Sequence, residues 1–593
     1  MILTIKIAWL FILGTAGLYN QQETEMVPDI QQEIEIAEGN VYEVGPGKDY
    51  TSLHQVPWGG LMPGDKVLIH WRQEPYKEKF ALSRMGTVEA PITVSGVPGP
   101  DGQLPVLDGN GATIVSQYSF YNDNRCVVKV GGARFAGSQG QGGVGNLIIE
   151  NLEIRSAHEN YTYFDRGAEK PYLKNASPIY VEYGENIIIR NNIFTDCGNG
   201  LFTASGSKNV TIEGNYLYNN GVINSIYEHG VYMAGNGLLF QFNYFGPLKE
   251  NHSTIGNNIK TRGAGEIIRY NFILGGNRAF DLVDGSDFVD LPSYHETHIY
   301  GNVIIDNGQS TNSSMVHYGG DSGDTSIYRK GTLYFFNNTV LNIRPQSPNQ
   351  YIFHLETTRQ KLIAHNNIFY FSSNNAFLKT GGRQSGVFEL KNNWLVSNWK
   401  TGIDAIESAY TDITAENTVV GQSPGFVNMA EMDFRLLPES ACIDAGTSLH
   451  PNVLPAHNVI YQYVKHQSGE ERPVDEVPDI GAFEFMDEIS GINSKIPKKT
   501  LCQVYPNPAT DVLFVKVESY HTSKYFYQLF DLNGKVVQNR VFEEKETVIH
   551  VGHLKPAAYI LNIYSIEENV KLGGIASGRI QPRLLNSIKI IKQ

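Results

Sequence analysis

The sequence has little cysteine, no excess of positive charge and no long apolar run in its main body. Among 593 residues there are four cysteines, without a CxxC pair or a Cys/His cluster: Cys126, Cys197, Cys442 and Cys502. This spacing argues against a disulfide framework and a zinc site, and favours isolated buried thiols. The net charge of −14 argues against a general nucleic-acid-binding protein, which needs a broad basic surface.

The apolar stretch at the N-terminus predicts export. A single lysine, Lys6, precedes an apolar run from Ile7 to about Leu18, which is too short to span a bilayer. No later segment is apolar enough to do so. We therefore expect residues 1–20 to be a secretory signal peptide, and the polar, acidic residues 21–40 to form a flexible lead.

A repeat occupies the middle of the chain. Segments such as NIIIRNNIF (186–194) and NVTIEGNYL (209–217) share an apolar run, a variable pair, an asparagine and a second apolar run. These asparagines follow one another at intervals of 23 to 36 residues, at Asn192, Asn215, Asn243, Asn271, Asn302, Asn338, Asn367 and Asn393. Three short strands with their turns need about this length, so the repeat predicts a β-solenoid, whereas leucine-rich and propeller signatures do not occur.

The repeated asparagines are expected to be structural. Asparagine tolerates the left-handed backbone region at a corner, and its amide can bond the asparagine of the next coil. We therefore predict a ladder of asparagines that fixes the register between coils, and we assign none of them to catalysis.

The opening of the repeat region predicts the end of such a solenoid. From Val41, strands such as KVLIH (66–70) and GTVEAPITVSG (86–96) accompany a short helix capped near Asp49. This opening resembles the first coils and cap of right-handed parallel β-helix proteins of the pectate-lyase-like superfamily. The resemblance implies an all-β, right-handed parallel β-helix over residues 41–485, in which residues 434–446 and 478–485 form a closing coil.

The composition changes after a linker that we predict over residues 486–500. Segments such as VYPNPATDVLFVKVE (504–518) alternate as strands of a small β-sandwich over residues 501–593, with a hairpin turn at Asn533-Gly534. The YPNPATD opening and the Lys-rich last strand resemble the C-terminal sorting domain of the Bacteroidetes type IX secretion system. The resemblance implies the type IX machinery as a partner, and a protein that is secreted or attached to the cell surface.

Polar side chains gather on one face between His229 and Asp287. Because coils stack about 4.8 Å apart, outward residues of successive strands form columns. The strands HGVYM (229–233), NNIKTR (257–262) and RAFDLVD (278–284) and two later ones predict a column of His229, Tyr232, Lys260, Arg262, Asp281, His317, His354 and Glu356. Charged side chains aligned in this way favour a functional strip over a solvated face.

A hydrolase resemblance is incomplete at this strip. HGVYMAGN (229–236) followed by Lys260 is similar to the Gly-His-Gly and Arg-Ile-Lys motifs of polygalacturonase-type hydrolases. Those enzymes carry three aspartates on the two preceding coils, where residues 175–184 and 197–206 of this chain contain a single acid, Glu182. Inverting hydrolysis needs a carboxylic acid and a carboxylate base, so the sequence weighs against this reaction.

β-Elimination requires different groups. It needs a cation to neutralise the uronic-acid carboxylate, a base for the C5 proton and an acid for the departing O4. Parallel β-helix lyases of the chondroitinase B, alginate lyase and pectate lyase groups use Lys or Arg, which implies this role for Lys260 and Arg262, with His229 and Tyr232 as acid or base. Further substrate contacts are expected from Arg269, Arg278, Asp281, His317, His354 and Glu356.

The sequence therefore predicts a secreted, monomeric enzyme that cleaves a uronic-acid-containing polysaccharide by β-elimination and binds no nucleic acid. No metal ligands are assigned, although calcium held by Asp281, Asp284 and Asp287 is left open. Two alternatives also stay open. One is a glycoside hydrolase that uses Asp281, Asp284 or Glu356, and the other is a non-catalytic carbohydrate-binding or surface-structural solenoid.

Overall fold

The computed structural model describes most of the chain between Gly39 and Lys592, in two compact units that divide after Met486. The described residues are 39–115, 118–135, 143–252, 255–308, 312, 314–344, 349–379, 386–402, 412–473, 476–486, 502–506, 509–517, 524–531, 536–542, 546–566 and 582–592. The predicted signal peptide and residues 487–500 of the predicted linker lie outside them. No helix within the described residues is long and apolar enough to cross a membrane.

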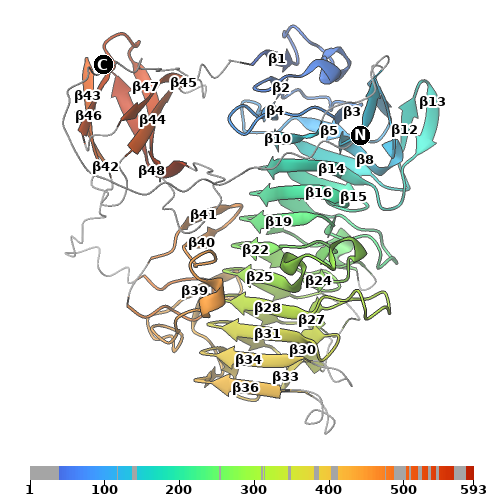
Figure 1. Ribbon diagram of the computed structural model, residues 1–593, viewed down its shortest axis with the longest axis vertical. Helices are drawn as coiled ribbons and strands as arrows, with labels where there is room; N and C mark the ends of the chain where they lie inside the picture. Colours follow the sequence, from blue (N-terminus) through green and yellow to red (C-terminus); the bar gives the residue numbers. More distant parts are fainter. Residues whose placement is uncertain are drawn as a thin grey trace, which may run out of the picture. The chain divides into compact units, whose positions relative to one another are not determined.

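The first unit is a right-handed parallel β-helix whose coils are stacked from β1 to β36 (Figure 1). Most coils contribute a strand to each of three faces, and the strands of successive coils pair in parallel. Side chains alternate inward and outward along each strand, so the inward ones fill a continuous apolar core. Val231, Ile259 and Phe280, from three successive coils, are each fully buried in it.

The strands are named by face. The site face contains β3 (Glu78–Leu82), β8 (Cys126–Val130), the first halves of β14 (Ser177–Arg190) and β16 (Phe202–Glu213), β18 (Val231–Met233), β21 (Ile259–Thr261), β24 (Phe280–Leu282), β27 (Ser314–Tyr318), β30 (Asn349–Leu355) and β33 (Asn375–Lys379). The second face contains β1 (Val41–Val44), β2 (Lys66–His70), β4 (Ile92–Val97), β10 (Gly145–Glu150), the second halves of β14 and β16, β19 (Asn236–Gln241), β22 (Ile267–Arg269), β25 (Glu296–Tyr300), β28 (Gly331–Phe336), β31 (Gln360–His365), β34 (Val387–Lys391) and β36 (Asp412–Glu416). The third face contains β5 (Val106–Asp108), β11 (Glu153–Ala157), β15 (Ile193–Cys197), β17 (Tyr216–Tyr218), β20 (Tyr244–Phe245), β23 (Phe272–Leu274), β26 (Val303–Asp306), β29 (Thr339–Asn342), β32 (Ile368–Phe371), β35 (Trp394–Val396) and β37 (Val419–Gly421).

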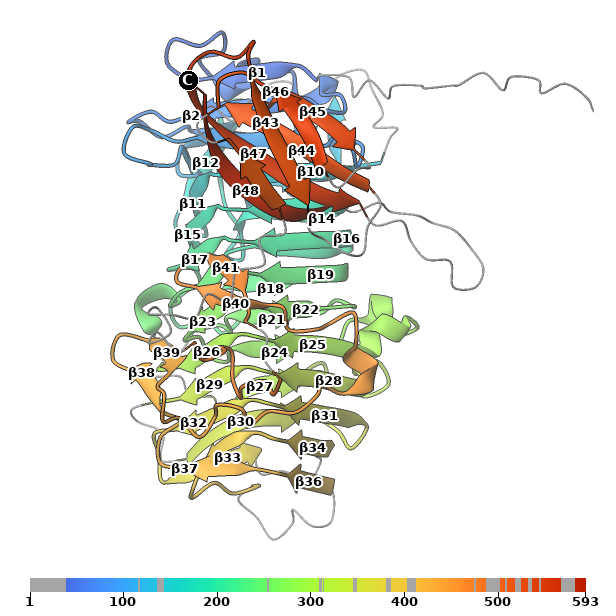
Figure 2. The same cartoon turned by 90° about the vertical axis from the view of Figure 1, so that its left-hand side faces the viewer.

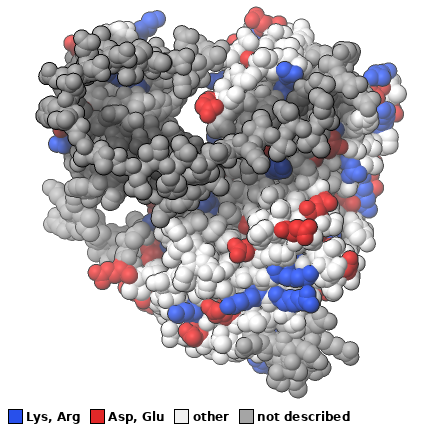
Figure 3. All heavy atoms as spheres, in the orientation of Figure 1, with Lys and Arg blue, Asp and Glu red and all other residues white. Residues whose placement is uncertain are grey.

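Loops between these strands carry short elements of their own. They comprise β6 (Ala112–Ile114), the hairpin of β12 (Thr162–Asp165) and β13 (Ala168–Pro171), the pair β7 (Tyr118–Phe120) and β9 (Ala133–Phe135), and 3-10 turns at Asp123–Arg125, Lys249–Asn251, Ser286–Phe288 and Pro292–His295. A further 3-10 turn, Pro451–Val453, comes after the last strand of the three faces. Figure 3 shows acidic and basic side chains interspersed over the described surface in the view of Figure 1. The second face carries such pairs, with Arg190 at 2.6 Å from Glu150 and Lys361 at 2.9 Å from Glu389.

The predicted asparagine ladder is present between the second and third faces. The side-chain amide of each member donates to the Oδ1 atom of the next over 2.9–3.1 Å, from Asn192 through to Asn393. The members are fully buried or nearly so, so each bond is made away from water. The ladder fixes the register of eight successive coils.

The left-handed backbone conformation lies one residue earlier than predicted. The residue before each ladder asparagine has a positive φ, as at Asn191 (55°), Gly214 (62°), Phe242 (56°) and Tyr270 (55°). The residue with positive φ forms the bend between the two faces. The asparagine after it has an ordinary negative φ, and its side-chain amide points along the stack of coils. Asparagine is common at both positions because it suits both tasks.

The N-terminal end of the barrel is covered by two 3-10 turns, where a helix capped near Asp49 was predicted. The first, Leu53–Gln55, is capped by the hydroxyl of Ser52. In the second, Trp58–Gly60, Trp58 is fully buried and its ring stacks on Phe80 with centroids 4.0 Å apart. The cap therefore shields the end of the apolar core.

Residues 422–473 and 476–486 run back along the outside of the barrel, shown in orange in Figure 2, and do not form the predicted closing coil. This returning segment carries the antiparallel pairs β38 (Phe426–Asn428) with β39 (Asp433–Leu436), and β40 (Tyr461–Val464) with β41 (Ser468–Glu471). Gln467 donates to the carbonyl of Gly214 over 3.0 Å, and the N–H of Ala482 donates to Thr339 over 3.0 Å. The returning segment is thus hydrogen-bonded to coils that are far apart in sequence.

The second unit is a small β-sandwich. One sheet contains β42 (Cys502–Tyr505), β43 (Val512–Val517) and β46 (Glu546–His550), and the other contains β45 (Val536–Phe542), β44 (Lys524–Asp531), β47 (Ala557–Ile566) and β48 (Pro582–Lys592). Leu513 of one sheet and Leu529 and Leu561 of the other are fully buried in one core. The predicted turn at Asn533-Gly534 lies outside the described residues.

Three of the four cysteines are free, buried thiols, as the sequence predicted. Burial raises the pKa of Cys126 to about 11, so this thiol stays protonated and unreactive at neutral pH. Cys197 and Cys442 are likewise fully buried.

Candidate functional site

Parallel pairing aligns five polar side chains of the site face. Tyr232 lies beside Lys260, Lys260 beside Asp281, Asp281 beside His317, and His317 beside His354, each one coil further along. The apolar residues that alternate with them are buried in the core, so these five side chains lie on the outer surface of the barrel. We call them the site column.

Lys260 is the charged centre of the site column. Its Nζ donates to Oδ2 of Asp281 and to Oδ2 of Asp321, in both cases over 2.7 Å. Its side chain is only 10% exposed. Burial by itself would lower the pKa of Lys260, but the two carboxylates outweigh burial and raise it. Lys260 is therefore a fixed ammonium group that holds two carboxylates close together.

Asp281 is a buried carboxylate with four donors. Oδ2 accepts from Lys260 and from the amide of Asn257 (2.8 Å), while Oδ1 accepts from Nδ1 of His317 (2.7 Å) and from Arg278 (3.1 Å). Burial would raise its pKa, but the hydrogen bond from His317 and the charge of Lys260 hold the pKa well below its usual range. Asp281 is thus ionised and orients its neighbours.

Arg262 connects Tyr232 to the mouth of the site. Its Nε donates to the phenol oxygen of Tyr232 over 2.9 Å, and its other nitrogens donate to Oδ1 of Asp321 and to the backbone carbonyl of Asp284, each over 2.7 Å. Asp284 is buried, and its Oδ1 accepts the backbone N–H of Asp321 over 2.6 Å. One carboxylate, that of Asp321, is therefore held by both Lys260 and Arg262.

His229 is buried beside Tyr232. It is 2% exposed, and its Nδ1 accepts the backbone N–H of Asn257 over 3.0 Å. Burial, and next the charge of Lys260, lower its pKa to about 3, so the ring is neutral at pH 7 with its proton on Nε2. The ring packs edge-on against Tyr232, with centroids 5.4 Å apart. His229 therefore packs against Tyr232, and its predicted role as an acid or base stays a prediction.

A cleft of about 320 Å³ opens beside the upper end of the site column. Phe202 and Tyr232 line it with rings that are parallel within 2° and 5.4 Å apart. Arg262 and the segment from Asp284 to Phe288 also line it. The cleft thus combines flat apolar surface with a guanidinium group, which is the mixture that ligand sites for amphipathic molecules show.

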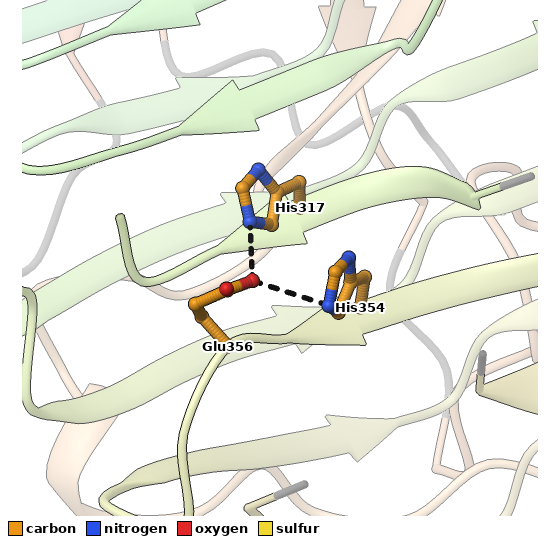
Figure 4. A group of neighbouring side chains, drawn as sticks. All are labelled: His317, His354 and Glu356. Carbon is orange, nitrogen blue, oxygen red and sulfur yellow. Dashed lines mark hydrogen bonds and ion pairs between the residues drawn. The ribbon is translucent and has the colours of Figure 1, made fainter. Parts of the chain in front are cut away.

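At the lower end of the site column, two imidazoles converge on one carboxylate (Figure 4). The Nε2 atoms of His317 and His354 each lie 3.1 Å from Oε2 of Glu356. Burial lowers the pKa of His354 to about 4, and the charge of His317 adds to this effect. Burial would also lower the pKa of His317, but its bonds to Asp281 and Glu356 raise it. Among the described residues, these three side chains have the donor types and spacing to hold a metal ion.

Two arginines that the sequence assigned to substrate binding lie in different places. Arg278 reaches the site, where it contacts Asp281 and donates to Asn312 over 3.2 Å. Arg269 does not, because the chain turns from the site face to the second face between β21 and β22. There its guanidinium donates to Gln241 (2.7 and 2.9 Å) and Tyr300 (3.0 Å). Arg269 is therefore removed from the site.

The calcium alternative does not fit the carboxylates proposed for it. The oxygens of Asp281 and Asp284 already accept from Lys260, Arg262 and Arg278. A calcium ion at this position would have to compete with three cations for the same carboxylate oxygens. Asp287, the third candidate, lines the cleft.

Sequence reasoning missed several residues that hold the site together. Asp321 follows β27 in a loop, and the pattern Gly-Gly-Asp after a strand was its only signal. Beneath the site, Glu266 and Arg329 form a fully buried ion pair at 2.7 Å, and Arg329 also donates to the carbonyl of Val283 over 2.8 Å. Nothing in the sequence distinguishes this pair from surface charges.

The comparison with known families identifies the second unit. Residues 503–572 match the secretion system C-terminal sorting domain. The chain is therefore a substrate of the type IX secretion system and is exported to the cell surface or the medium. Among curated protein sequences, none matches the chain significantly.

Solved structures resemble the chain at low identity. ORF18 of Geobacillus virus E2 is 14% identical with a TM-score of 0.28, over 61% of this chain and 53% of that one, so the chain spans about half of its length. A GH136 lacto-N-biosidase from Eubacterium ramulus is 13% identical (TM-score 0.32; 66% and 69% covered). A pectin methylesterase from Aspergillus niger is 8% identical (TM-score 0.25; 71% and 94% covered).

Proposed function

We propose that this protein is an exported enzyme that cleaves a uronic-acid-containing polysaccharide by β-elimination. The observation that carries the proposal is the carboxylate of Asp321, which bridges Lys260 and Arg262 with 2.7 Å bonds at each of its oxygens. An ammonium and a guanidinium group that each take one oxygen would neutralise a uronic-acid carboxylate in the same way, and elimination needs such neutralisation. The Asp321 side chain is 30% exposed and lies on a loop, so a substrate carboxylate is able to replace it.

The proposed reaction uses Tyr232 next to this carboxylate position. Arg262 donates to the phenol oxygen over 2.9 Å, which orients this oxygen beside the carboxylate position. The phenolate takes the C5 proton of the uronic acid, the C4–O4 bond breaks with formation of a C4=C5 double bond, and the proton returns to O4 of the departing sugar. Neutralisation of the carboxylate by Lys260 and Arg262 stabilises the negative charge that develops at C5.

The cleft supports binding of a chain of sugars. Phe202 and Tyr232 line the cleft with two stacked rings, and Arg262 lines it as well. A sugar bound beside Tyr232 has room in this cleft of about 320 Å³ for a neighbouring sugar, which favours an oligomeric or polymeric substrate over a single monosaccharide.

The proposal is tested with purified protein and a panel of polyuronates and glycosaminoglycans. The expected product absorbs in the ultraviolet because its new double bond is conjugated to the carboxylate. Lys260→Ala is expected to reduce this rate by about 10² to 10³, the usual cost of losing one group that stabilises a developing charge. Lys361→Ala, which removes a surface lysine of the second face, is the control. Absence of unsaturated product from every acidic glycan would refute the proposal.

A glycoside hydrolase is the second candidate, and the two carboxylates that share Lys260 favour it. Asp281 and Asp321 each place an oxygen 2.7 Å from Nζ of Lys260, so these oxygens are no further apart than twice that distance. Retaining glycosidases hold their two carboxyl groups about 5–5.5 Å apart. A hydrolase would release reducing ends without unsaturated product.

A further inference from the structure

The lower end of the site column contains a group of side chains that the proposed elimination does not use. His317 on β27 and His354 on β30 are paired neighbours on successive coils, and Glu356 follows β30 by one residue. The two imidazole rings are stacked with centroids 4.8 Å apart. Because neighbouring coils fix their backbones, the three side chains are held together without depending on a mobile loop.

Their donor atoms point to one position. Both Nε2 atoms lie 3.1 Å from the same oxygen of Glu356, and the three ligand-type atoms all lie within 4.8 Å of one another. Ligand bonds of about 2.0–2.2 Å in a tetrahedral zinc site put neighbouring ligand atoms about 3.3 Å apart. The spacing of these atoms therefore requires only small side-chain rotations to surround an ion.

His317 is also oriented as a ligand. Its Nδ1 faces Asp281 at 2.7 Å, which leaves Nε2 for the ion. A carboxylate behind the non-ligating nitrogen is the usual support of a metal-binding histidine, because it fixes the tautomer and makes the ligand more basic. Arg278, which lies 3.1 Å from Asp281, approaches His317 on the Nδ1 side, away from Nε2.

We propose that His317, His354 and Glu356 bind a divalent first-row transition-metal ion such as Zn²⁺. Two imidazoles and one carboxylate suit such an ion, whereas calcium and magnesium prefer oxygen ligands alone. Three protein ligands leave a coordination position for water or a substrate oxygen. His354 and Glu356 have side chains 33% and 31% exposed, so that position opens to solvent on the site face.

The site is tested by metal binding, which is independent of any reaction. Untagged full-length protein is stripped with a chelator and titrated with Zn²⁺ by calorimetry, and with Co²⁺ by visible absorption. We expect one ion per chain, a Co²⁺ spectrum of nitrogen and oxygen ligation, and a rise in unfolding temperature with added Zn²⁺. His354→Ala and Glu356→Gln, at partly exposed positions, are each expected to weaken binding by at least about 100-fold, more than loss of a supporting residue costs.

The matched control is His365→Ala on the second face. His365 is also buried and also lies beside a glutamate, with Glu389 at 3.6 Å. Within the part of the chain that the structure describes, these two do not belong to a group of three ligand atoms within 4.8 Å of one another. This variant is expected to bind Zn²⁺ like the wild type. Failure of the wild type to bind Zn²⁺ or Co²⁺, or equal binding by His354→Ala, would mean that His317 bridges Asp281 and Glu356 through hydrogen bonds alone. If the wild-type protein binds Zn²⁺ but forms no unsaturated product from any acidic glycan, the proposed function is refuted and the metal site is supported.

Discussion

At the scale of single residues, Lys260 determines the charge balance of the site. It is nearly buried between two carboxylates, one of which, Asp281, is also buried. A buried ion pair adds little stability overall, but removal of one partner leaves an uncompensated charge. The site therefore depends on Lys260 for folding as well as for chemistry.

Lys260→Met is accordingly expected to lower the free energy of unfolding by about 3–5 kcal/mol, because Asp281 loses its nearest cation. Urea unfolding of the exported protein measures the effect. Lys361→Met serves as a control, since Lys361 and Glu389 form a surface pair with side chains 38% and 34% exposed, and such pairs contribute about 0–1 kcal/mol. If Lys260→Met and Lys361→Met lower the unfolding free energy equally, burial of the Lys260 ion pair does not determine its contribution to stability.

Asp321 distinguishes the two candidate reactions. In a lyase it occupies the substrate carboxylate position, so Asp321→Ala is expected to retain elimination and to lower KM for an acidic glycan. In a hydrolase it acts as acid or base, and the same variant is expected to lose about 10²- to 10⁴-fold in rate. Steady-state kinetics with both assays decides between them, and Asp324→Ala, at an exposed position in the same loop, is the control.

At the scale of elements, the asparagine ladder sets how coils stack. Each member donates to the next and also to a main-chain carbonyl, as Asn271 does to Phe240 and Arg269. The strands of the site face are only three residues long in β18, β21 and β24. Their register, and with it the site column, therefore relies on constraints made at the ladder.

Asn271→Ala is expected to cost about 2–4 kcal/mol of unfolding free energy, because it removes several buried bonds and leaves the donors of Asn243 without their acceptor. Chemical denaturation provides the measurement. Asn398→Ala, which removes one bond from an exposed asparagine, is expected to cost less than about 1 kcal/mol. If the ladder does not stabilise the protein, Asn271→Ala and Asn398→Ala will lower the unfolding free energy by the same small amount.

At the scale of the whole molecule, buried histidines make stability depend on pH. Burial, and next the neighbouring His457, lower the pKa of His298 to about 3. This is below the unfolded value of about 6.5, so the unfolded chain takes up the proton first. The stabilisation is complete above pH 6.5 and is lost as the pH falls towards 3. His229 acts in the same direction.

Between pH 7 and pH 5, each of these histidines is expected to reduce the unfolding free energy by about 2 kcal/mol. His298→Gln removes one titrating group and is therefore expected to reduce the pH-dependent loss by about that amount. Denaturation at the two pH values gives both numbers. An unchanged loss in the variant would show that His298 is protonated equally in both states.

Removal of residues 487–593 tests the role of the second unit. Because this unit contains the match to the sorting domain, the truncated protein is expected to remain inside the cell envelope while the full chain reaches the surface or the medium. Immunoblots of cell fractions provide the measurement. Export of the truncated chain would place the sorting signal elsewhere.

The sequence by itself determined the features that repeat. Two periods in the sequence predict these features: side chains alternate every two residues along a strand, and the asparagine motif recurs every 23 to 36 residues, once per coil. Together they predict the solenoid, the ladder and the order of the site column, which is Tyr232, Lys260, Asp281, His317 and His354. The sorting domain also followed from the sequence, since its opening motif is contiguous.

The tertiary structure decided what the loops and the depth of burial contribute. Asp321 meets Lys260 across 61 residues, and Arg329 meets Glu266 across 63, through loops whose lengths follow no period. The turn between two faces excluded Arg269, and close packing beside Tyr232 made His229 a neutral, buried ring. These outcomes depend on three-dimensional contacts between coils and on desolvation, neither of which is encoded in the spacing of residues along one strand.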